Sequence, residues 1–544
     1  MRSKPLASFF KRVSLVLILF TATFPAMLQA QSAQSRWVYP EPDGRLSYLT
    51  TPKGDRIMDF SFAGYRSGGV ALPDVPVKIT VFPPADPAED CTARIQSAID
   101  EVSALAPDEN GFRGTVLLAP GEFRCSGELI ISTDGVVLRG SGSSRDGRGT
   151  AILMTGEKHA AIRASLPTNT APRNSEELFF SKITDLYVPA ASREFTVADG
   201  SGFKAGDEIE LRRPVTESWI EFMQMHDLVR DEKPQTWIRP GTVITMRRRI
   251  AAVDGNRITV EVPLSDSFDA TYLNPPGTRV VKVLPPQLLT EVGIEHFSIV
   301  SPAQAVNHSQ ELYMAIRLTG KDCWIRDIRC EETMNSVSVG GRRITLQQVA
   351  VIRKALHSGA SKPAEFAPNG TQVLMDRCYV EGDNIWFMAL GGQVSGPIVL
   401  LNCRFDGNGR AEGHQRWTTG LLMDNCVLPN GGIDFKNRGS MGSGHGWGLG
   451  WAVAWNCQAK DIVNQRPPGV LNWSIGSSGE RKLIPRPFGS GPLLPEGEVD
   501  SPGVRVSPGS LYLAQLRERL GDEALRAIGY SSPDELPDPT PAVY

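Results

Sequence analysis

The second half of the chain repeats one short pattern, an apolar run followed by Asp or Asn and then Cys, and this repeat limits the possible folds more than any other feature. It occurs four times, at Leu374–Cys378, Leu400–Cys403, Leu421–Cys426 and Ala454–Cys457, with spacings of 25, 23 and 31 between successive cysteines. A period in the twenties with returning apolar residues is typical of a solenoid, whose coils bury their faces against their neighbours. We therefore expect an all-β chain that forms a right-handed parallel β-helix, because crossovers between parallel strands are almost always right-handed.

The composition agrees with a β-rich chain and excludes some partners. Its 544 residues include 53 Gly and 40 Pro, which indicates many turns. The formal net charge of −3 gives no general attraction to nucleic acid or to an anionic membrane, so we expect neither as a partner. An anionic polymer would have to bind at a local cluster of Arg and Lys.

The first thirty residues have the pattern of an export signal. Four basic residues precede an apolar stretch, Val13–Leu28, and Leu28–Ala30 offers a small-residue cleavage site. A membrane anchor is the alternative, but the stretch is short and is interrupted by Thr21, Thr23 and Pro25. The pattern predicts a secreted or periplasmic protein.

Eight cysteines in an exported protein usually indicate disulfides. Six of them end strand-like phrases, which favours free thiols buried as small apolar groups. Cys91 and Cys125 lie outside the repeat, so a disulfide between them stays open. The chain has no Cys-x-x-Cys pair, and we expect no metal and no other cofactor.

Changes in pattern divide the chain into six regions. After the signal, 1–30, a Pro- and Gly-rich segment covers 31–90, and 91–190 begins with apolar residues at helical spacing, as in a helix that caps the first coils. Alternating polar and apolar residues predict a small inserted β domain over 191–285. The main β-helix follows over 286–480. The tail, 481–544, carries one amphipathic helix from about Leu511 to Ile528.

The exported start, the helix around Gln96–Ile99, the strand that begins Gly114-Thr115-Val116 and the ladder of coils resemble the pectate lyase superfamily of right-handed parallel β-helices. The segment Gly413–Gly476 is similar to a recurring signature in a poorly characterised branch of those proteins. The resemblance implies a carbohydrate-active protein acting on uronic-acid polymers. The aspartate cluster that holds calcium in pectate lyases has no counterpart in this chain.

The cysteine repeat predicts that two histidines lie close together. His414 and His445 each lie twelve residues before a repeat cysteine, Cys426 and Cys457. If the cysteines stack, the two imidazoles occupy the same position on successive coils, about 4.8 Å apart. The same offset places Arg416 beside Trp447. Lys436, Asn437 and Arg438 lie in the longer coil, where we expect a loop bordering the histidines.

These residue types suit removal of a proton beside a carboxylate. A histidine accepts a proton near neutral pH, and an arginine binds a carboxylate with two hydrogen bonds. We predict a monomeric polysaccharide lyase that cleaves an acidic, uronate-containing polysaccharide by β-elimination. The predicted catalytic residues are His414, His445, Arg416 and Arg438, and the predicted substrate-binding residues are Trp417, Trp447, Lys436 and Asn437.

Three alternatives stay open at this point. The stacked histidines could form a purely structural ladder. A glycoside hydrolase would need two carboxyl groups flanking the bond, and Asp424, Asp434, Asp376 and Asp383 are available. A non-catalytic polysaccharide-binding protein would need only tryptophans that stack on sugar rings.

Overall fold

The computed structural model describes residue 1 and residues 33–167, 175–305, 311–355, 362–489 and 491–535. The predicted export signal therefore lies outside the described residues, apart from Met1. No helix within the described ranges is long and apolar enough to cross a membrane.

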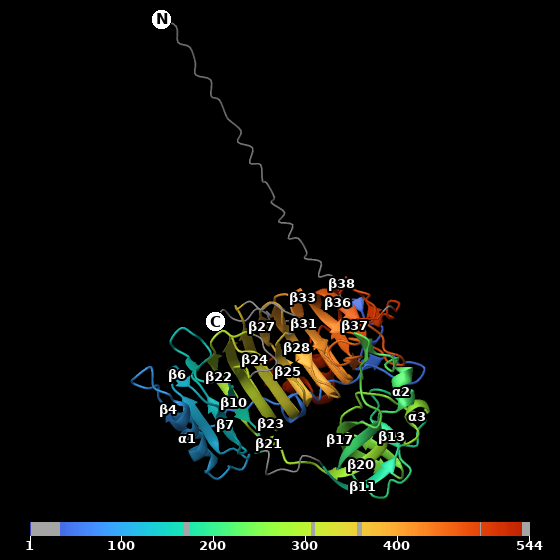
Figure 1. The fold of residues 1–544 in the computed structure, drawn as a ribbon, viewed down its shortest axis with the longest axis horizontal. Helices are drawn as coiled ribbons and strands as arrows, with labels where there is room; N and C mark the ends of the chain where they lie inside the picture. The colour runs from blue at the N-terminus through green and yellow to red at the C-terminus, as the bar shows by residue number, and fades with distance from the viewer. Residues whose placement is uncertain (2–32, 168–174, 306–310, 356–361, 490, 536–544) are drawn as a thin grey trace. The chain divides into compact units, whose positions relative to one another are not determined.

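The core of the molecule is one large sheet of parallel strands that follow one another nearly in chain order (Figure 1). One row of paired strands runs β5 (Gly114–Leu118), β8 (Val136–Arg139), β22 (Gly293–Val300), β23 (Met314–Glu331), β24 (Val337–Ile352), β26 (Thr371–Asp376), β29 (Ser395–Leu401), β32 (Thr418–Asp424), β35 (Val453–Trp455), β37 (Trp473–Ile475) and β39 (Glu498–Asp500). A second row runs β25 (Ala364–Pro368), β28 (Trp386–Leu390), β31 (Arg410–Gly413), β33 (Val427–Phe435), β36 (Gln458–Asn464) and β38 (Ser478–Arg481). The predominantly β chain and its parallel stacking are as predicted, and the handedness stays a prediction.

The repeated phrase has a clear structural cause. The residue before each repeat cysteine is left-handed, with φ of 53° at Arg377, 51° at Asn402, 55° at Asn425 and 52° at Asn456. Asn tolerates this conformation better than most residues, which explains its recurrence at the bend after each strand.

The repeat cysteines stack as predicted. The Sγ atoms of Cys403, Cys426 and Cys457 each donate to a carbonyl oxygen of the preceding coil, at 3.5, 3.4 and 3.3 Å. All eight cysteines are buried and free, so the disulfide between Cys91 and Cys125 that the sequence left open is not formed.

The amino-terminal end of the stack is covered by α1 (Thr92–Ser103), as the helical spacing predicts. Ile95, Ala98, Ile99 and Val102 are buried in the same apolar core as the strands β6 (Gly121–Cys125), β7 (Leu129–Ile131), β9 (Thr150–Met154) and β10 (Ala160–Ala164). The first described strand of the sheet is β4 (Val77–Val81), which pairs with β5.

An antiparallel sheet interrupts the stack. Its order is β11 (Glu176–Lys182), β20 (Arg279–Leu284), β14 (Glu208–Pro214), β17 (Val243–Asp254), β18 (Arg257–Val260) and β13 (Glu194–Thr196), and it carries the short helices α2 (Glu217–Phe222) and α3 (Ala270–Leu273). The predicted start at residue 191 is too late, because β11 already belongs to this sheet. A register shift between Glu177 and Phe179 breaks the alternation that would have marked β11 in the sequence.

The described part of the tail holds two helices where the sequence predicted one. Gly521, with φ of 81°, ends α4 (Leu511–Leu520), and α5 (Asp522–Ala527) begins directly after it. Leu511, Tyr512 and Leu513 are fully buried in an apolar cluster that includes Leu374 and Val399 of the strands, so the tail covers one face of the stack.

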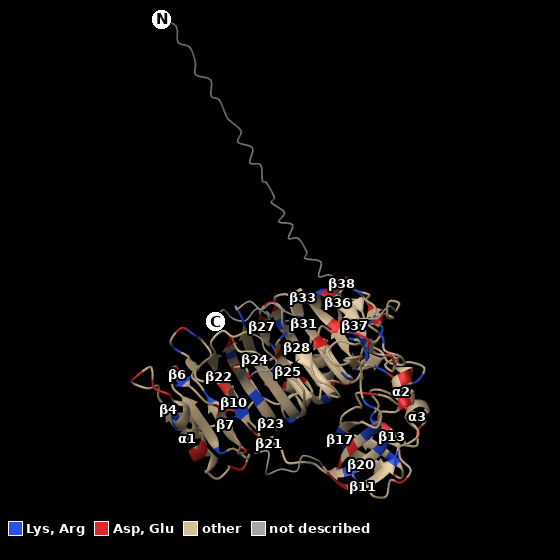
Figure 2. Ribbon diagram, viewed as in Figure 1, with Lys and Arg blue, Asp and Glu red and all other residues tan. Residues whose placement is uncertain are grey.

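Figure 2 shows both signs of charge along the strands and in the inserted sheet, in keeping with the small net charge.

Candidate functional site

The predicted site lies on the second row of strands. Glu412 of β31 and Asp434 of β33 are register partners on adjacent strands. Their neighbours Ala411 and Ile433 belong to the apolar core, so alternation along each strand turns the two carboxylates to the outer face. His414 follows β31 directly, and Lys436 follows β33.

The two histidines are neighbours, as the cysteine offset predicts. Their ring centroids are 4.9 Å apart. The backbone amide of Arg416 donates to the His445 carbonyl oxygen at 3.0 Å, and Thr418 is in register with Leu449. The pairing set by Cys426 and Cys457 therefore extends back to the histidines.

Glu412 fixes the orientation of His414. Its Oε1 lies 2.6 Å from Nδ1 of His414 and 3.0 Å from NH1 of Arg438, which also donates to the His414 carbonyl oxygen at 2.8 Å. NH1 of Arg438 also lies 2.7 Å from the same Nδ1, but Glu412 and the His414 carbonyl oxygen can accept both of its hydrogens. An ionised carboxylate only accepts, so it selects the tautomer with the proton on Nδ1. That tautomer leaves Nε2 of His414 as an acceptor that has no hydrogen-bond partner among the described residues.

His445 has a different environment. Burial, followed by the positive charge of Arg438, lowers the pKa of His445 to about 3. Its Nδ1 is buried and has no hydrogen-bond partner among the described residues. His445 is therefore a neutral imidazole at neutral pH and a weaker base than an ordinary histidine.

Acidic and basic side chains form an ion-pair cluster beside the histidines. Arg410 contacts Asp434 and also Asp461 of β36, the latter at 2.6 Å, and Lys436 lies 2.5 Å from Asp434. Burial would raise the pKa of Asp434, but the charges of Lys436 and Arg410 outweigh it and lower that pKa to about 2. Asp434 therefore stays ionised under all ordinary conditions.

Lys362 lies near this cluster. Burial lowers the pKa of Lys362, and the negative charge of Glu412 partly offsets that effect. Lys362 is half-buried and forms no ion pair within 4.0 Å with the residues that the structure describes. Its ammonium group is thus available to an incoming anion.

Three of the predicted substrate-binding residues are in fact buried, and that assignment is wrong for them. Trp417, Trp447 and Asn437 have exposed fractions of 1%, 2% and 1%. The indole of Trp417 donates to Asp266 at 2.8 Å, and that of Trp447 donates to the Met223 carbonyl oxygen at 3.0 Å. The two tryptophans pack the inserted domain against the stack.

The inserted domain also explains the glycines around His445. A Cβ atom at Gly444 would lie 2.8 Å from the Thr236 carbonyl oxygen, and one at Gly446 would lie 2.3 Å from the Trp237 ring. These glycines allow the inserted chain to approach closely. Arg416 is held there too, because its Nε donates to the Trp237 carbonyl oxygen at 2.8 Å.

Arg438 cannot serve as the freely accessible carboxylate clamp that the sequence predicted. Its side chain is only 5% exposed and is bound to Glu412 and His414, so it positions those two groups. Its guanidinium lies 5.5 Å from the ring of Trp386, and that ring stands edge-on to His414 with centroids 4.6 Å apart.

Sequence reasoning missed Glu412, Trp386 and Lys362. Glu412 lies two residues before His414, the spacing that places side chains on one face of a strand, and this signal was available. Trp386 and Lys362 lie 17 and 16 residues before the repeat cysteines Cys403 and Cys378, so counting back from the repeat could also have found them.

No protein family matches the chain, and no curated protein matches it. Among solved structures, the chain is similar to the Gp54 tailspike of Acinetobacter baumannii bacteriophage AP22, in complex with A. baumannii capsular saccharide, at 11% identity and a TM-score of 0.33, with 72% of this chain and 58% of the tailspike covered. The gp49 tailspike of Pseudomonas phage LKA1 matches at 13% identity and a TM-score of 0.35, with 77% and 72% covered. The A-module of Azotobacter vinelandii mannuronan C-5 epimerase AlgE4 matches at 12% identity and a TM-score of 0.28, with 75% and 89% covered. The chain thus spans less than two thirds of the AP22 tailspike. Likenesses this weak assign no family.

Proposed function

We propose that the protein is an exported polysaccharide lyase that cleaves a uronate-containing polysaccharide by β-elimination. The observation that carries the proposal is His414 held by Glu412 with Nε2 left free, next to a group of Lys and Arg side chains. A positioned base beside cations is what proton removal from the carbon next to a carboxylate requires.

In the proposed reaction, Nε2 of His414 takes the proton from C5 of the uronate. The electron pair of the C5–H bond forms the C4–C5 double bond, and the C4–O bond to the leaving sugar breaks. The proton passes to the leaving oxygen, so His414 returns to its neutral form. Glu412 stabilises the imidazolium between these two transfers, as a buried carboxylate does when it holds the tautomer of a catalytic histidine.

The substrate carboxylate gains negative charge as the proton leaves, and cations stabilise that charge. Lys362, which has no ion pair among the described residues, is the best candidate to bind it, with Lys436 at the edge of the site. A bound carboxylate would also favour a proton on His445, whose low pKa comes from burial and from the nearby charge of Arg438. The half-buried ring of Trp386 is better placed than Trp417 or Trp447 to contact a sugar.

Glycoside hydrolysis is the second candidate, because Glu412 and Asp434 are register partners on adjacent strands. A hydrolase needs one carboxyl group that carries a proton at working pH. The lowered pKa of Asp434, about 2, fits a nucleophile but not that acid. Glu412 would have to be the acid, although it already accepts from His414 and Arg438.

A panel of uronate polymers, assayed for ultraviolet absorbance and for reducing ends, separates the candidates. A lyase raises both signals, a hydrolase raises only reducing ends, and a binding protein raises neither. We expect both signals from the wild type and from Trp447→Phe, which keeps the buried packing. If reducing ends form without ultraviolet absorbance, the protein is a hydrolase and the lyase proposal is wrong.

A further inference from the structure

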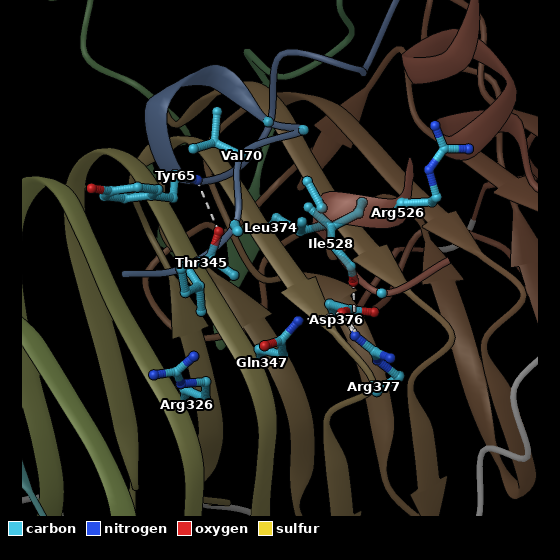
Figure 3. A pocket seen from close by; sticks show the side chains of 16 residues that line it. Tyr65, Val70, Arg326, Thr345, Gln347, Leu374, Asp376, Arg377, Arg526 and Ile528 are labelled. Carbon is cyan, nitrogen blue, oxygen red and sulfur yellow. Dashed lines mark hydrogen bonds and ion pairs between the residues drawn. The ribbon is translucent and has the colours of Figure 1, made fainter. Parts of the chain in front are cut away.

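A second concave site lies on other strands of the stack. A cavity of about 280 Å³ opens between the loop Tyr65–Leu72, the end of α5 and the strands β23, β24 and β26 (Figure 3). None of its lining residues belongs to the histidine site.

The floor of this cavity carries unused hydrogen-bond donors. Arg326, Gln347 and Asp376 are register partners on three adjacent strands. Arg326 donates hydrogen bonds from Nε and NH2 to Glu295, at 3.2 and 2.7 Å. Arg377 donates in the same way to Asp376, at 3.1 and 2.6 Å. Both arginines thereby use one edge of the guanidinium. Neither NH1 group has a partner among the described residues.

A third arginine, Arg526 of α5, lies at the rim of the cavity, and in Figure 3 its guanidinium points away from Arg326 and Arg377. The Arg526 side chain is exposed and forms no hydrogen bond or ion pair with the part of the chain that the structure describes. The lining holds three arginines and one aspartate. Arg377 pairs with Asp376, and Arg326 pairs with the buried Glu295, so Arg526 is the arginine of the lining without an acidic partner among the described residues. Because its guanidinium and the two free NH1 groups can each donate to a carboxylate, the cavity favours an anion.

Part of the remaining wall is apolar. Leu72, Leu374 and Ile528 line the cavity beside the arginines. Gly68 and Gly69 hold the loop in place, with φ of 80° and 75°. A Cβ atom on Gly69 would lie 2.9 Å from Cβ of Ala524 in α5, so the loop packs directly against the helix. A rigid wall of this kind suits a ligand with an apolar face as well as a charge.

We propose that this cavity is a binding site for a small sugar acid. The carboxylate lies on the floor between Arg326 and Arg377, with Arg526 at the rim, and the ring lies against Leu72, Leu374 and Ile528. The volume of about 280 Å³ is slightly below the usual range for ligand pockets, which suits one sugar unit. The proposal is independent of the lyase function, since it uses none of the same residues.

Calorimetric titration of the mature protein with D-glucuronate, D-glucose and inorganic phosphate tests it. We expect glucuronate to bind at least about tenfold more tightly than glucose, since glucose lacks the charge. Phosphate should bind more weakly than glucuronate, since it has no apolar face. Equal binding of glucose, or tighter binding of phosphate, would overturn the sugar-acid assignment.

Matched variants locate the site. Arg526→Gln should weaken glucuronate binding about tenfold or more, because it removes one charge-assisted hydrogen bond. Arg517→Gln, an exposed arginine of α4 outside the cavity, should leave binding unchanged. If Arg526→Gln binds normally while Lys362→Ala does not, glucuronate occupies the histidine site and the proposal fails. Polymer cleavage by Arg526→Gln should equal that of the wild type.

Discussion

Replacing Asp424 by Asn should change how the stability of the protein depends on pH. Asp424 is fully buried at the end of β32, where its Oδ2 accepts from the Ser510 hydroxyl at 2.7 Å and from the Tyr512 amide at 2.8 Å. It thereby ties the start of α4 to the stack. Burial raises the pKa of Asp424 from 3.8 to about 7.

The magnitude follows from that pKa. A group whose pKa is raised in the folded protein gives its full stability below the pKa of the unfolded chain, near 3.8, and loses it as the pH rises to about 7. Each pH unit in this window is worth about 1.4 kcal/mol, so ionisation of folded Asp424 costs up to about 4 kcal/mol. The amide oxygen of Asn can accept the same two hydrogen bonds without the charge. The stability of Asp424→Asn relative to the wild type should therefore rise by that amount between pH 4 and pH 7.

Urea unfolding followed by tryptophan fluorescence, at several pH values across this window, measures the difference. Buried Glu365, whose pKa burial also raises to about 7, is present in both proteins and cancels. The hydrogen bond of 3.3 Å that Asn425 donates to Asp424 is lost in the Asp424→Asn variant at every pH. Its loss therefore changes the free energy of unfolding by a constant amount and does not affect the pH dependence. Parallel stability curves for the two proteins would refute the reasoning.

Three further outcomes follow from the same structure. In urea unfolding, Asn402→Ala should be less stable than Asn402→Gly by about 1 kcal/mol. Both variants lose the hydrogen bond to Tyr530, but only alanine is strained at φ of 51°. Equal stability of the two variants would contradict the left-handed bend. Thiol titration of the unfolded, unreduced protein should find eight reactive groups, and six would indicate a disulfide. Glu412→Gln should lower kcat on a cleaved polymer about 10²–10⁴-fold with little change in KM, since it removes the group that orients His414; an unchanged kcat would make Glu412 structural.

The sequence predicted which residues are neighbours wherever the spacing of the repeat determines how the coils align. Because the cysteine spacing equals the coil length, counting back twelve residues from Cys426 and Cys457 found the adjacent histidines. The helix that caps the stack was found from the spacing of Ile95, Ala98 and Ile99.

The sequence failed where distant segments meet. Trp417 and Trp447 looked like sugar platforms because nothing local shows that the chain around Trp237 covers them. Arg438 looked like a free cation because its partner Glu412 lies on the neighbouring strand. The tail helix was predicted as one because the apolar spacing continues past Gly521, while the backbone there is left-handed.

The role of His414 as the proton acceptor is tested most directly by removing its imidazole and supplying another. On a polymer that the wild type cleaves, the rate of unsaturated product formation is measured for His414→Ala and for His159→Ala, a control histidine just before β10. The account predicts a loss of about 10²–10⁴-fold for His414→Ala, partial recovery with added free imidazole, and no loss for the control. Near-wild-type turnover by His414→Ala would place the base elsewhere and make the histidine pair structural.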